Sequence, residues 1–400
     1  MRLENILHPS RSWRLRRWRE HWRRRNVSSG YPDANGRSPQ RSPMALTSEE
    51  ISRVMQQQYG LVIEGTPHKM KGGMESAVWS VRTRDGAWVV KVFQPRRVAV
   101  TLVEAEVRLY EYLNRLGFHT PATLQTTGGR KVATLIADGS EFPLLVMRLE
   151  KLRKCTPSSI SAPELKLIAK TAAQIHERLQ DYPDKDQSFD LLSRPPAAEA
   201  YEKFAASPLA AELTSAERAR LREINGKMVD YVRRNPPNGF LGKSLLHGDF
   251  TLEHAQFLPN GEVYLFDFAD RWWGPIVYGL AVPLAHFYSE DNISFGRWEE
   301  LKHWFLEGYT SERKLTLEEE AALNPALIVR LLNEIAYLSE QATDHRDGIK
   351  TCDLMRRYDL ADYLLHDFDR GFRMRSLNTV HQWLISVVSW LGGVSSYLDS

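Results

Sequence analysis

The feature that most constrains the fold is a short strand-like island in an otherwise helical second half of the chain. It runs from Leu245 to Phe268, begins with LLHGDFTLEH, and ends with a predicted strand from Glu262 to Phe268 after a hairpin turn at Asn260-Gly261. Asp249 and Asp267 lie in or beside its short β segments, each flanked by apolar residues. The loop and the hairpin are expected to fold these two carboxylates toward each other.

Packing does not explain these two aspartates, because burying a carboxylate without a partner is costly. Phosphoryl transfer uses such a pair: one carboxylate orients the attacking hydroxyl and accepts its proton, while the other holds the metal that neutralises phosphate charge. A structural alternative is that Asp249 only caps a turn. The paired carboxylates therefore favour phosphoryl transfer as the chemistry of the island.

The segment before the island predicts a small antiparallel sheet that carries one helix. Apolar and polar residues alternate in short runs, and the Asp85-Gly86 dipeptide predicts a hairpin between two of them. Helical spacing appears once, with leucines near one face. The predicted strands are Ala77 to Arg82, Trp88 to Phe93, Thr134 to Ala137 and Leu144 to Leu149, and the predicted helix is Leu102 to Leu116.

After Glu150 long amphipathic helical stretches dominate, and 400 residues are too many for one compact core. We therefore predict an α+β protein of two lobes, a sheet lobe over residues 44–150 and a mainly helical lobe over 151–400. The predicted helices are Pro163 to Leu179, Ala216 to Arg233, Phe295 to Tyr309 and Leu317 to Thr343.

Residues 1–43 are predicted to be a basic, disordered tail. Arg11 to Arg25 reads RSWRLRRWREHWRRR, and a linker rich in Gly, Pro, Ser and Asn follows it. Such a stretch can bind nucleic acid weakly, or it can be a solvated tail or a mis-assigned start. After Met44, Thr47 and Glu50 form the pattern of a capping box at a helix start.

Composition places further limits on the chain. Two cysteines, Cys155 and Cys352, are too few for a disulfide framework, which favours the cytoplasm. The most apolar stretch, Trp383 to Val394, is shorter than the roughly 20 residues of a membrane span, so no membrane partner is expected. No secretory signal is visible at the start of the sequence.

Several motifs together resemble one family. HGDFTLEH resembles the catalytic loop H-G-D-x-x-x-x-N of the aminoglycoside phosphotransferase and choline kinase-like superfamily, and LFDFAD resembles its metal-binding segment. KGGMESAVWSV resembles its phosphate-covering loop, and Lys91 in WVVKVF stands at the position of its strand lysine. The ordered set spans about Lys71 to Leu280 and implies a bilobal protein kinase-like fold.

The resemblance implies a role for each matching residue. Asp249 would meet the acceptor hydroxyl, and Lys91 would reach the phosphates of ATP. A helix glutamate would orient that lysine, and Glu106 is preferred to Glu104 from its offset to the helix leucines. The implied cofactor contacts are Gly72, Gly73, Ser76, Lys91, Glu106, Met147 and Arg148, and the implied ligands of Mg²⁺ are His254 and Asp267.

Two positions depart from the family pattern. His254 stands where the family has asparagine, and an imidazole ligand suits Mn²⁺ better than Mg²⁺, which prefers oxygen. In GPIVYGLA, Gly279 replaces an aspartate that ordinarily supports the catalytic loop. Asp270 or His247 would have to compensate, or the loop would be loosened.

The sequence thus predicts an ATP-dependent phosphotransferase that acts on a hydroxyl of a small molecule. In the island the catalytic-loop motif reads H-G-D and not the H-R-D of protein kinases, so an amino alcohol, a homoserine-like compound or an antibiotic is the expected acceptor. The alternatives are a Ser/Thr protein kinase of the same superfamily, a nucleotide-binding pseudokinase, and a nucleic-acid-binding protein acting through the tail. The identity of the acceptor and the oligomeric state stay open.

Overall fold

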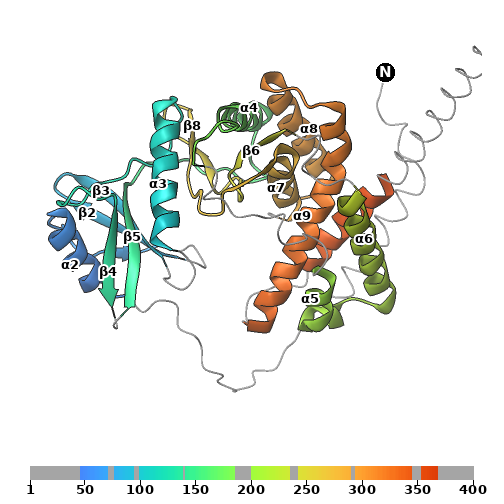
Figure 1. Ribbon diagram of the computed structural model, residues 1–400, viewed down its shortest axis with the longest axis horizontal. Helices are drawn as coiled ribbons and strands as arrows, with labels where there is room; N and C mark the ends of the chain where they lie inside the picture. Colours follow the sequence, from blue (N-terminus) through green and yellow to red (C-terminus); the bar gives the residue numbers. More distant parts are fainter. Residues whose placement is uncertain are drawn as a thin grey trace, which may run out of the picture. The chain divides into compact units, whose positions relative to one another are not determined.

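The computed structural model describes residues 46–70, 76–93, 99–137, 140–184, 200–234, 242–289, 293–344 and 353–367. These residues form an antiparallel five-stranded sheet with two helices, followed by a mainly helical lobe (Figure 1). The predicted α+β, kinase-like architecture is confirmed. The predicted tail, Cys352 and the apolar stretch Trp383 to Val394 lie outside the described residues, and the lobe boundaries stay predictions.

The sheet has the strand order β1-β2-β3-β5-β4, and each neighbouring pair is antiparallel. Lys91 lies on the central strand, opposite Val78 on one side and Leu145 on the other. Because its backbone is hydrogen bonded into the sheet on both edges, the lysine is fixed in direction. The strands are β1 (His68–Lys69), β2 (Ser76–Thr83), β3 (Gly86–Phe93), β4 (Val132–Ala137) and β5 (Ser140–Arg148).

The predicted hairpin between β2 and β3 forms, with its turn one residue earlier than the Asp85-Gly86 dipeptide predicts. Thr83 pairs with Gly86, so Arg84 and Asp85 are the two turn residues. Gly86 begins β3 at a φ of 142°, a conformation that favours glycine. The hydroxyl of Thr83 donates to the carbonyl of Gly86 at 3.2 Å and closes the turn.

Two helices pack on this sheet, α2 (Ser48–Tyr59) and α3 (Val100–Arg115) (Figure 1). The predicted capping box is confirmed, because the Thr47 side chain accepts from the Glu50 N–H and the Glu50 carboxylate accepts from the Thr47 N–H. Helix α3 contacts β4 and β5 through an apolar face that includes Leu109 and Leu113. That face also carries Glu106 and Tyr110, both buried.

The island forms two separate β pairs rather than one continuous unit. Its lead-in strand β6 (Lys243–Leu246) pairs with β9 (Trp272–Pro275), and β7 (Ala255–Phe257) pairs with β8 (Val263–Leu265). The predicted strand from Glu262 to Phe268 is therefore too long. It ends at Leu265 because Asp267 takes a φ of 65°, which a strand cannot accommodate.

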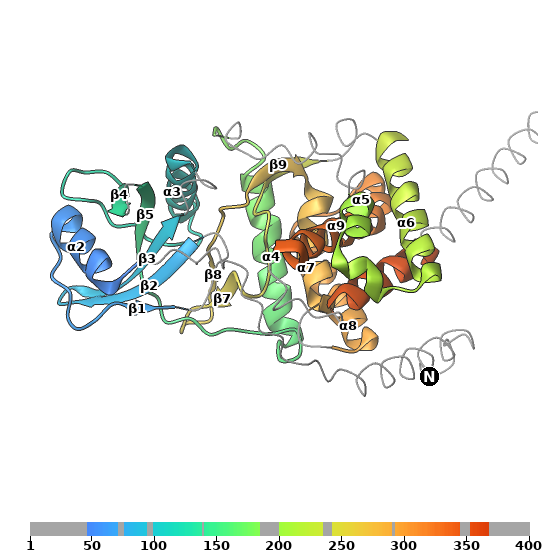
Figure 2. The same ribbon diagram turned by 90° about the horizontal axis from the view of Figure 1, so that it is seen from below.

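Each predicted helix of the second lobe is present within one to three residues at its ends. Helix α4 packs against α8, and α9 packs against α7 and α5 (Figures 1 and 2). Helix α7 was not predicted, since its sequence IVYGLAVPLAHFYS is apolar on nearly all sides. The helices are α4 (Ala162–Arg178), α5 (Ala200–Ala206), α6 (Ser215–Arg234), α7 (Ile276–Ser289), α8 (Phe295–Glu312), α9 (Leu317–Asp344) and a helical segment over residues 353–367.

Within the described ranges no helix combines enough length with enough apolar character to cross a membrane. The core of the second lobe is built from large side chains of α8, including Trp298, Phe305 and Tyr309. The Trp298 indole N–H donates to the carbonyl of Leu284 at 2.8 Å, so its one polar group is satisfied. Helix α8 thereby holds α4 on one side and the apolar α7 on another.

The tight approach of α4 to α8 depends on Gly308. A Cβ at this position would lie 2.5 Å from the Lys166 carbonyl oxygen and 2.6 Å from the Lys166 Cα. We predict that Gly308→Ala lowers the free energy of unfolding by about 1–3 kcal/mol, the usual cost of overpacking a tight contact. Gly296→Ala on the same helix, where the nearest atom is 4.0 Å away, should be neutral or stabilising by up to about 1 kcal/mol. Urea unfolding midpoints of both variants test this, and equal shifts would contradict it.

Candidate active site

An ion pair joins the sheet to the island. The Lys91 ammonium lies 2.7 Å from Asp267 Oδ1, although the two residues are 176 positions apart in the chain. Burial lowers the pKa of Lys91, but the charges of Glu106 and Asp267 outweigh this effect and leave the pKa raised. Burial raises the pKa of Asp267, whereas Lys91 and His254 lower it to about 2. Both groups are therefore ionised at neutral pH.

A buried relay from α3 fixes the backbone of Asp267. The Asp267 N–H donates to the Tyr110 hydroxyl at 3.0 Å, and that hydroxyl donates to Glu106 Oε1 at 2.5 Å. Glu106 faces the site, whereas Glu104 is exposed, in keeping with the choice between them made from the helix leucines. Its hydrogen bond goes to Tyr110, and it acts on Lys91 through charge. Asp267 is also the one non-glycine residue with positive φ among those described.

The imidazole of His254 lies between the two aspartates. Its Nδ1 is 2.8 Å from the Asp249 carbonyl oxygen and 3.4 Å from Asp249 Oδ2, while its Nε2 is 3.9 Å from Asp267 Oδ2. A carbonyl can only accept, so Nδ1 donates the hydrogen bond, and Nε2 is the ring nitrogen that faces Asp267. The island thus brings together the two carboxylates that its sequence pattern predicts to converge.

The donors at this point suit one divalent cation held jointly with a nucleotide. Lys91 occupies Oδ1 of Asp267, and Oδ2 stays on the side of His254. Magnesium is commonly held by one or two side chains plus substrate phosphates. The described residues hold no group of three or more His, Cys, Asp or Glu side chains that could bind a metal by themselves. The two-donor arrangement therefore fits a metal that arrives with ATP.

His247 ties the catalytic loop to the segment before Asp267. Its Nε2 donates to the carbonyl of Phe266 at 3.0 Å, and its Nδ1 accepts from the Asp249 N–H at 3.3 Å. Burial and the neighbouring His254 lower the pKa of His247 to about 4, so the ring is neutral and can make both bonds. From the sequence, His247 was one of two residues that could compensate for Gly279 in supporting the loop. Its two hydrogen bonds suit that role.

Two glycines explain how closely the supporting segments pack. Gly248 has a φ of 85°, and a Cβ there would lie 1.8 Å from the Asp270 carbonyl oxygen. A Cβ on Gly279 would meet Leu246 at 3.0 Å and the His176 ring at 3.2 Å. The space that a side chain at position 279 needs is therefore filled by neighbours. His176 is buried and hydrogen bonded to the Tyr309 hydroxyl at 2.9 Å.

The second oxygen of Asp249 faces residues that were not predicted. Oδ1 lies 3.7 Å from His286 Nε2 on α7 and 3.8 Å from Arg330 Nη2 on α9. Glu334 binds Arg330 at 2.8 Å and Arg357 at 2.7 Å. The sequence signal for a functional role of Arg330 and Glu334 was weak, because an Arg–Glu pair four residues apart is common on solvated helix faces. Tyr110 was missed for a similar reason, since an apolar helix face usually buries a tyrosine for packing alone.

The structure describes only some of the residues predicted to contact the nucleotide. Gly72 and Gly73 lie outside the described residues, and Ser76 begins β2 as a half-buried residue. Met147 is buried in β5, and the Arg148 N–H already donates to the Ala122 carbonyl at 3.0 Å. The role predicted for this stretch in binding adenine stays a prediction, and any base would need backbone groups other than the Arg148 N–H.

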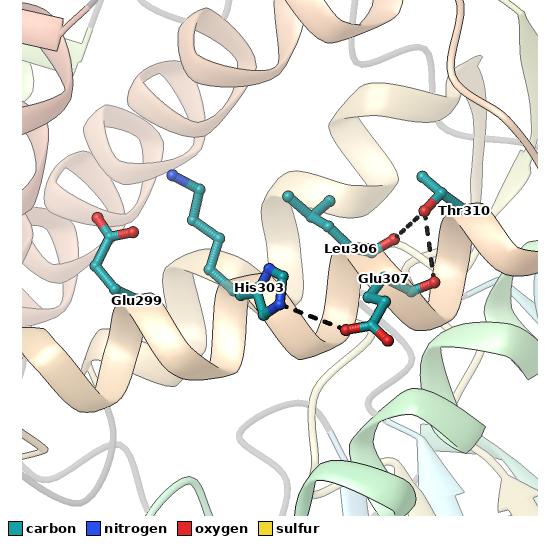
Figure 3. Close-up of a pocket in the computed structure, with 6 residues that line it drawn as sticks. Glu299, His303, Leu306, Glu307 and Thr310 are labelled. Atoms are coloured by element: carbon teal, nitrogen blue, oxygen red, sulfur yellow. Dashed lines mark hydrogen bonds and ion pairs between the residues drawn. The ribbon is translucent and has the colours of Figure 1, made fainter. Parts of the chain in front are cut away.

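A hollow on the second lobe is separate from these residues. Figure 3 shows its lining side chains along α8, where His303 pairs with Glu307 and the Thr310 hydroxyl bonds to backbone carbonyls of the same helix. None of the predicted catalytic, metal or nucleotide residues lines it. The hollow is formed by side chains of a single helix, and it is not part of the candidate site.

Comparison with known proteins agrees with this geometry. A model of the phosphotransferase enzyme family matches residues 68–315, more than half of the chain. The chain belongs to this family. As a member of the phosphotransferase family it carries both island aspartates and Lys91 within the matched region. No curated protein sequence matches the chain.

Solved structures share the fold of this phosphotransferase at low identity. An amicoumacin kinase in complex with AMP-PNP, Ca²⁺ and Ami has 16% identity and a TM-score of 0.60, covering 79% of this chain and 93% of that one. A microcompartment-associated aminopropanol kinase has 15% identity and a TM-score of 0.62, covering 81% and 97%. A choline kinase from Streptococcus pneumoniae has 16% identity and a TM-score of 0.51, covering 80% and 98%.

The relay through Tyr110 leads to a prediction for this phosphotransferase. Tyr110→Phe removes one hydroxyl and leaves the Asp267 N–H and the Glu106 carboxylate without it, which should lower the free energy of unfolding by about 1–3 kcal/mol. Tyr112→Phe is the control, because Tyr112 lies on the same helix and packs its ring against Tyr182. Thermal unfolding of both variants measures the difference. Equal melting temperatures would show that the relay contributes nothing.

Proposed function

We propose that this phosphotransferase moves the γ-phosphoryl group of ATP to a hydroxyl group of a small molecule. The observation that carries the proposal is the meeting of Lys91, Asp267, His254 and Asp249 within hydrogen-bonding or ion-pair distances. These are the parts that phosphoryl transfer requires: a cation for the phosphates, a metal site, and a carboxylate at the nucleophile. The nucleotide is supported by the AMP-PNP bound to the amicoumacin kinase of the same fold.

In the proposed reaction the acceptor hydroxyl donates a hydrogen bond to Asp249, which orients it and takes its proton. The acceptor oxygen then bonds to the γ-phosphorus as the bond from that phosphorus to the β,γ-bridging oxygen breaks, and ADP leaves with the electron pair. Lys91 would hold the phosphates, while Asp267 and His254 would hold the metal. A divalent cation would supply charge neutralisation on the transferred group. The residues contribute mainly position and electrostatics.

A small molecule is preferred as the acceptor to a protein. The catalytic loop reads H-G-D where protein kinases have H-R-D, and relatives of the same fold act on amicoumacin, aminopropanol and choline according to their names. The pseudokinase alternative rested on Gly279 and His254. The space at Gly279 is filled by packing, and His254 turns its Nε2 toward Asp267, the other proposed metal ligand, so neither residue argues against catalysis.

Two substitutions should separate chemistry from nucleotide binding. Asp249→Asn keeps the shape but cannot accept the proton, so turnover should fall about 10² to 10⁴-fold while ATP still stabilises the protein. Asp267→Ala should instead remove the metal-dependent stabilisation by ATP, which is roughly 2.7 kcal/mol for the unchanged protein at 100 times the dissociation constant. Thermal shift with and without metal, alongside ADP release, measures both. Absence of any ATP shift with Mg²⁺ and with Mn²⁺ would remove the proposal.

The proposed metal role of His254 has its own test. His254→Asn replaces an imidazole nitrogen by an amide oxygen, which Mg²⁺ prefers. The ratio of ATP affinity in Mg²⁺ to that in Mn²⁺ should rise on the order of tenfold, measured by titration calorimetry in each metal. His303→Asn, on the exposed face of α8, is the matched control and should leave the ratio unchanged. An unchanged ratio in His254→Asn would assign that residue to a support role only.

A further inference from the structure

We propose that the acceptor is a hydroxy compound bearing an anionic group, such as a carboxylate, rather than a cationic amino alcohol. This inference rests on the proposed function and concerns the side of Asp249 that faces away from the metal. Oδ2 of Asp249 is turned to His254, so Oδ1 is the oxygen left for the acceptor hydroxyl. The side chains around Oδ1 then decide which substituent can lie beside that hydroxyl.

Those side chains are basic. His286 Nε2 and Arg330 Nη2 approach Oδ1 to 3.7 Å and 3.8 Å, from two different helices. At 3.8 Å the guanidinium is an electrostatic neighbour of Asp249 and not its hydrogen-bond donor. An acceptor that brings its hydroxyl to Oδ1 therefore brings the atoms next to that hydroxyl close to a guanidinium. An ammonium group there would be repelled, and a carboxylate would be bound bidentately.

Arg330 is held in place by a buried anchor. Its Nε donates to Glu334 Oε1 at 2.8 Å, and the other oxygen of Glu334 accepts from Arg357 at 2.7 Å. Glu334 is only 8% exposed, yet the charges of Arg330, His286 and Arg357 outweigh its burial and lower its pKa to about 2. One carboxylate thus fixes two guanidinium groups. Because the anchor uses Nε, the η nitrogens of Arg330 keep donors for a ligand.

The charged side chains near Asp249 Oδ1 have a net positive charge. Arg330 and Arg357 carry two positive charges against the one negative charge of Glu334, which leaves one positive charge before His286 is counted. The carboxylate of Asp249 offsets this excess. When Asp249 takes the proton of the acceptor hydroxyl its negative charge is lost, and an anionic substituent on the same acceptor would then offset the excess. The acidic residues Glu290 and Asp291 lie outside the described residues and take no part in this inference.

The test compares three acceptors with one carbon skeleton: 3-hydroxypropanoate, 1,3-propanediol and 3-aminopropan-1-ol. Using the full chain with ATP and Mn²⁺, ADP release should give a kcat/KM for the hydroxy acid that exceeds that for the amino alcohol by about 10 to 100-fold, the usual strength of a charge-assisted hydrogen bond. Arg330→Gln should reduce the ratio to near one. Arg330→Lys should keep the preference for the acid, and Arg233→Gln, on an exposed arginine of α6, should change nothing.

The outcomes separate this inference from the proposed function. A higher kcat/KM for the amino alcohol, or a ratio that Arg330→Gln leaves unchanged, overturns the anionic acceptor while the kinase proposal stands. ATP-induced thermal shift in every variant shows that the fold and the nucleotide site are intact. Loss of that shift in the unchanged protein would instead overturn the proposed function. As a binding check, 3-hydroxypropanoate should compete with other acceptors in the unchanged protein and lose this effect in Arg330→Gln.

Discussion

The ion pair between Lys91 and Asp267 is the interaction on which the rest of the site depends. It links the central strand of the sheet to a loop of the helical lobe at 2.7 Å. Around it the side chains are arranged to keep Asp267 still: Tyr110 holds its N–H, and the buried Arg271 donates to the carbonyls of Phe268 and Leu102. Without this pair, the lysine proposed to bind phosphate and the proposed metal ligand would not be held at a fixed distance from each other. Helix α3 is thus a support of the site as well as a cover of the sheet.

The fold was largely predictable because its signals are local. Alternation and turn residues predicted four of the five strands of the sheet, β2 to β5, and helical spacing predicted α3, α4, α6, α8 and α9. The two-residue strand β1 was not predicted. The failures have physical causes. Helix α7 has no polar face to reveal its period, and β9 contains two tryptophans, a glycine and a proline, which resemble a loop. The strand before Asp267 ends early because that residue adopts a left-handed backbone conformation that no sequence pattern reveals.

The candidate site was predictable where a sequence motif marks the residue. Asp249, His254 and Asp267 belong to one motif-bearing segment, Lys91 was predicted from its resemblance to the strand lysine of the family, and these residues do converge. Tyr110, His286 and Arg330 approach these aspartates from helices that precede and follow the island, and each has an ordinary explanation in its own helix. Their meeting depends on how α3, α7 and α9 pack, which is a tertiary property. Long-range neighbours of this kind require coordinates.

The packing around Gly279 has a consequence for how such chains are recognised. A catalytic loop can be held by a carboxylate at the position of Gly279, or by hydrogen bonds of a histidine within the loop, as His247 does here. Leu246 and the His176 ring fill the space beside Gly279. An aspartate at this position would have to displace Leu246 or the His176 ring, so the glycine and its neighbours go together. A search pattern that insists on aspartate before the Leu-Ala pair would discard this chain, although two hydrogen bonds of His247 hold its loop.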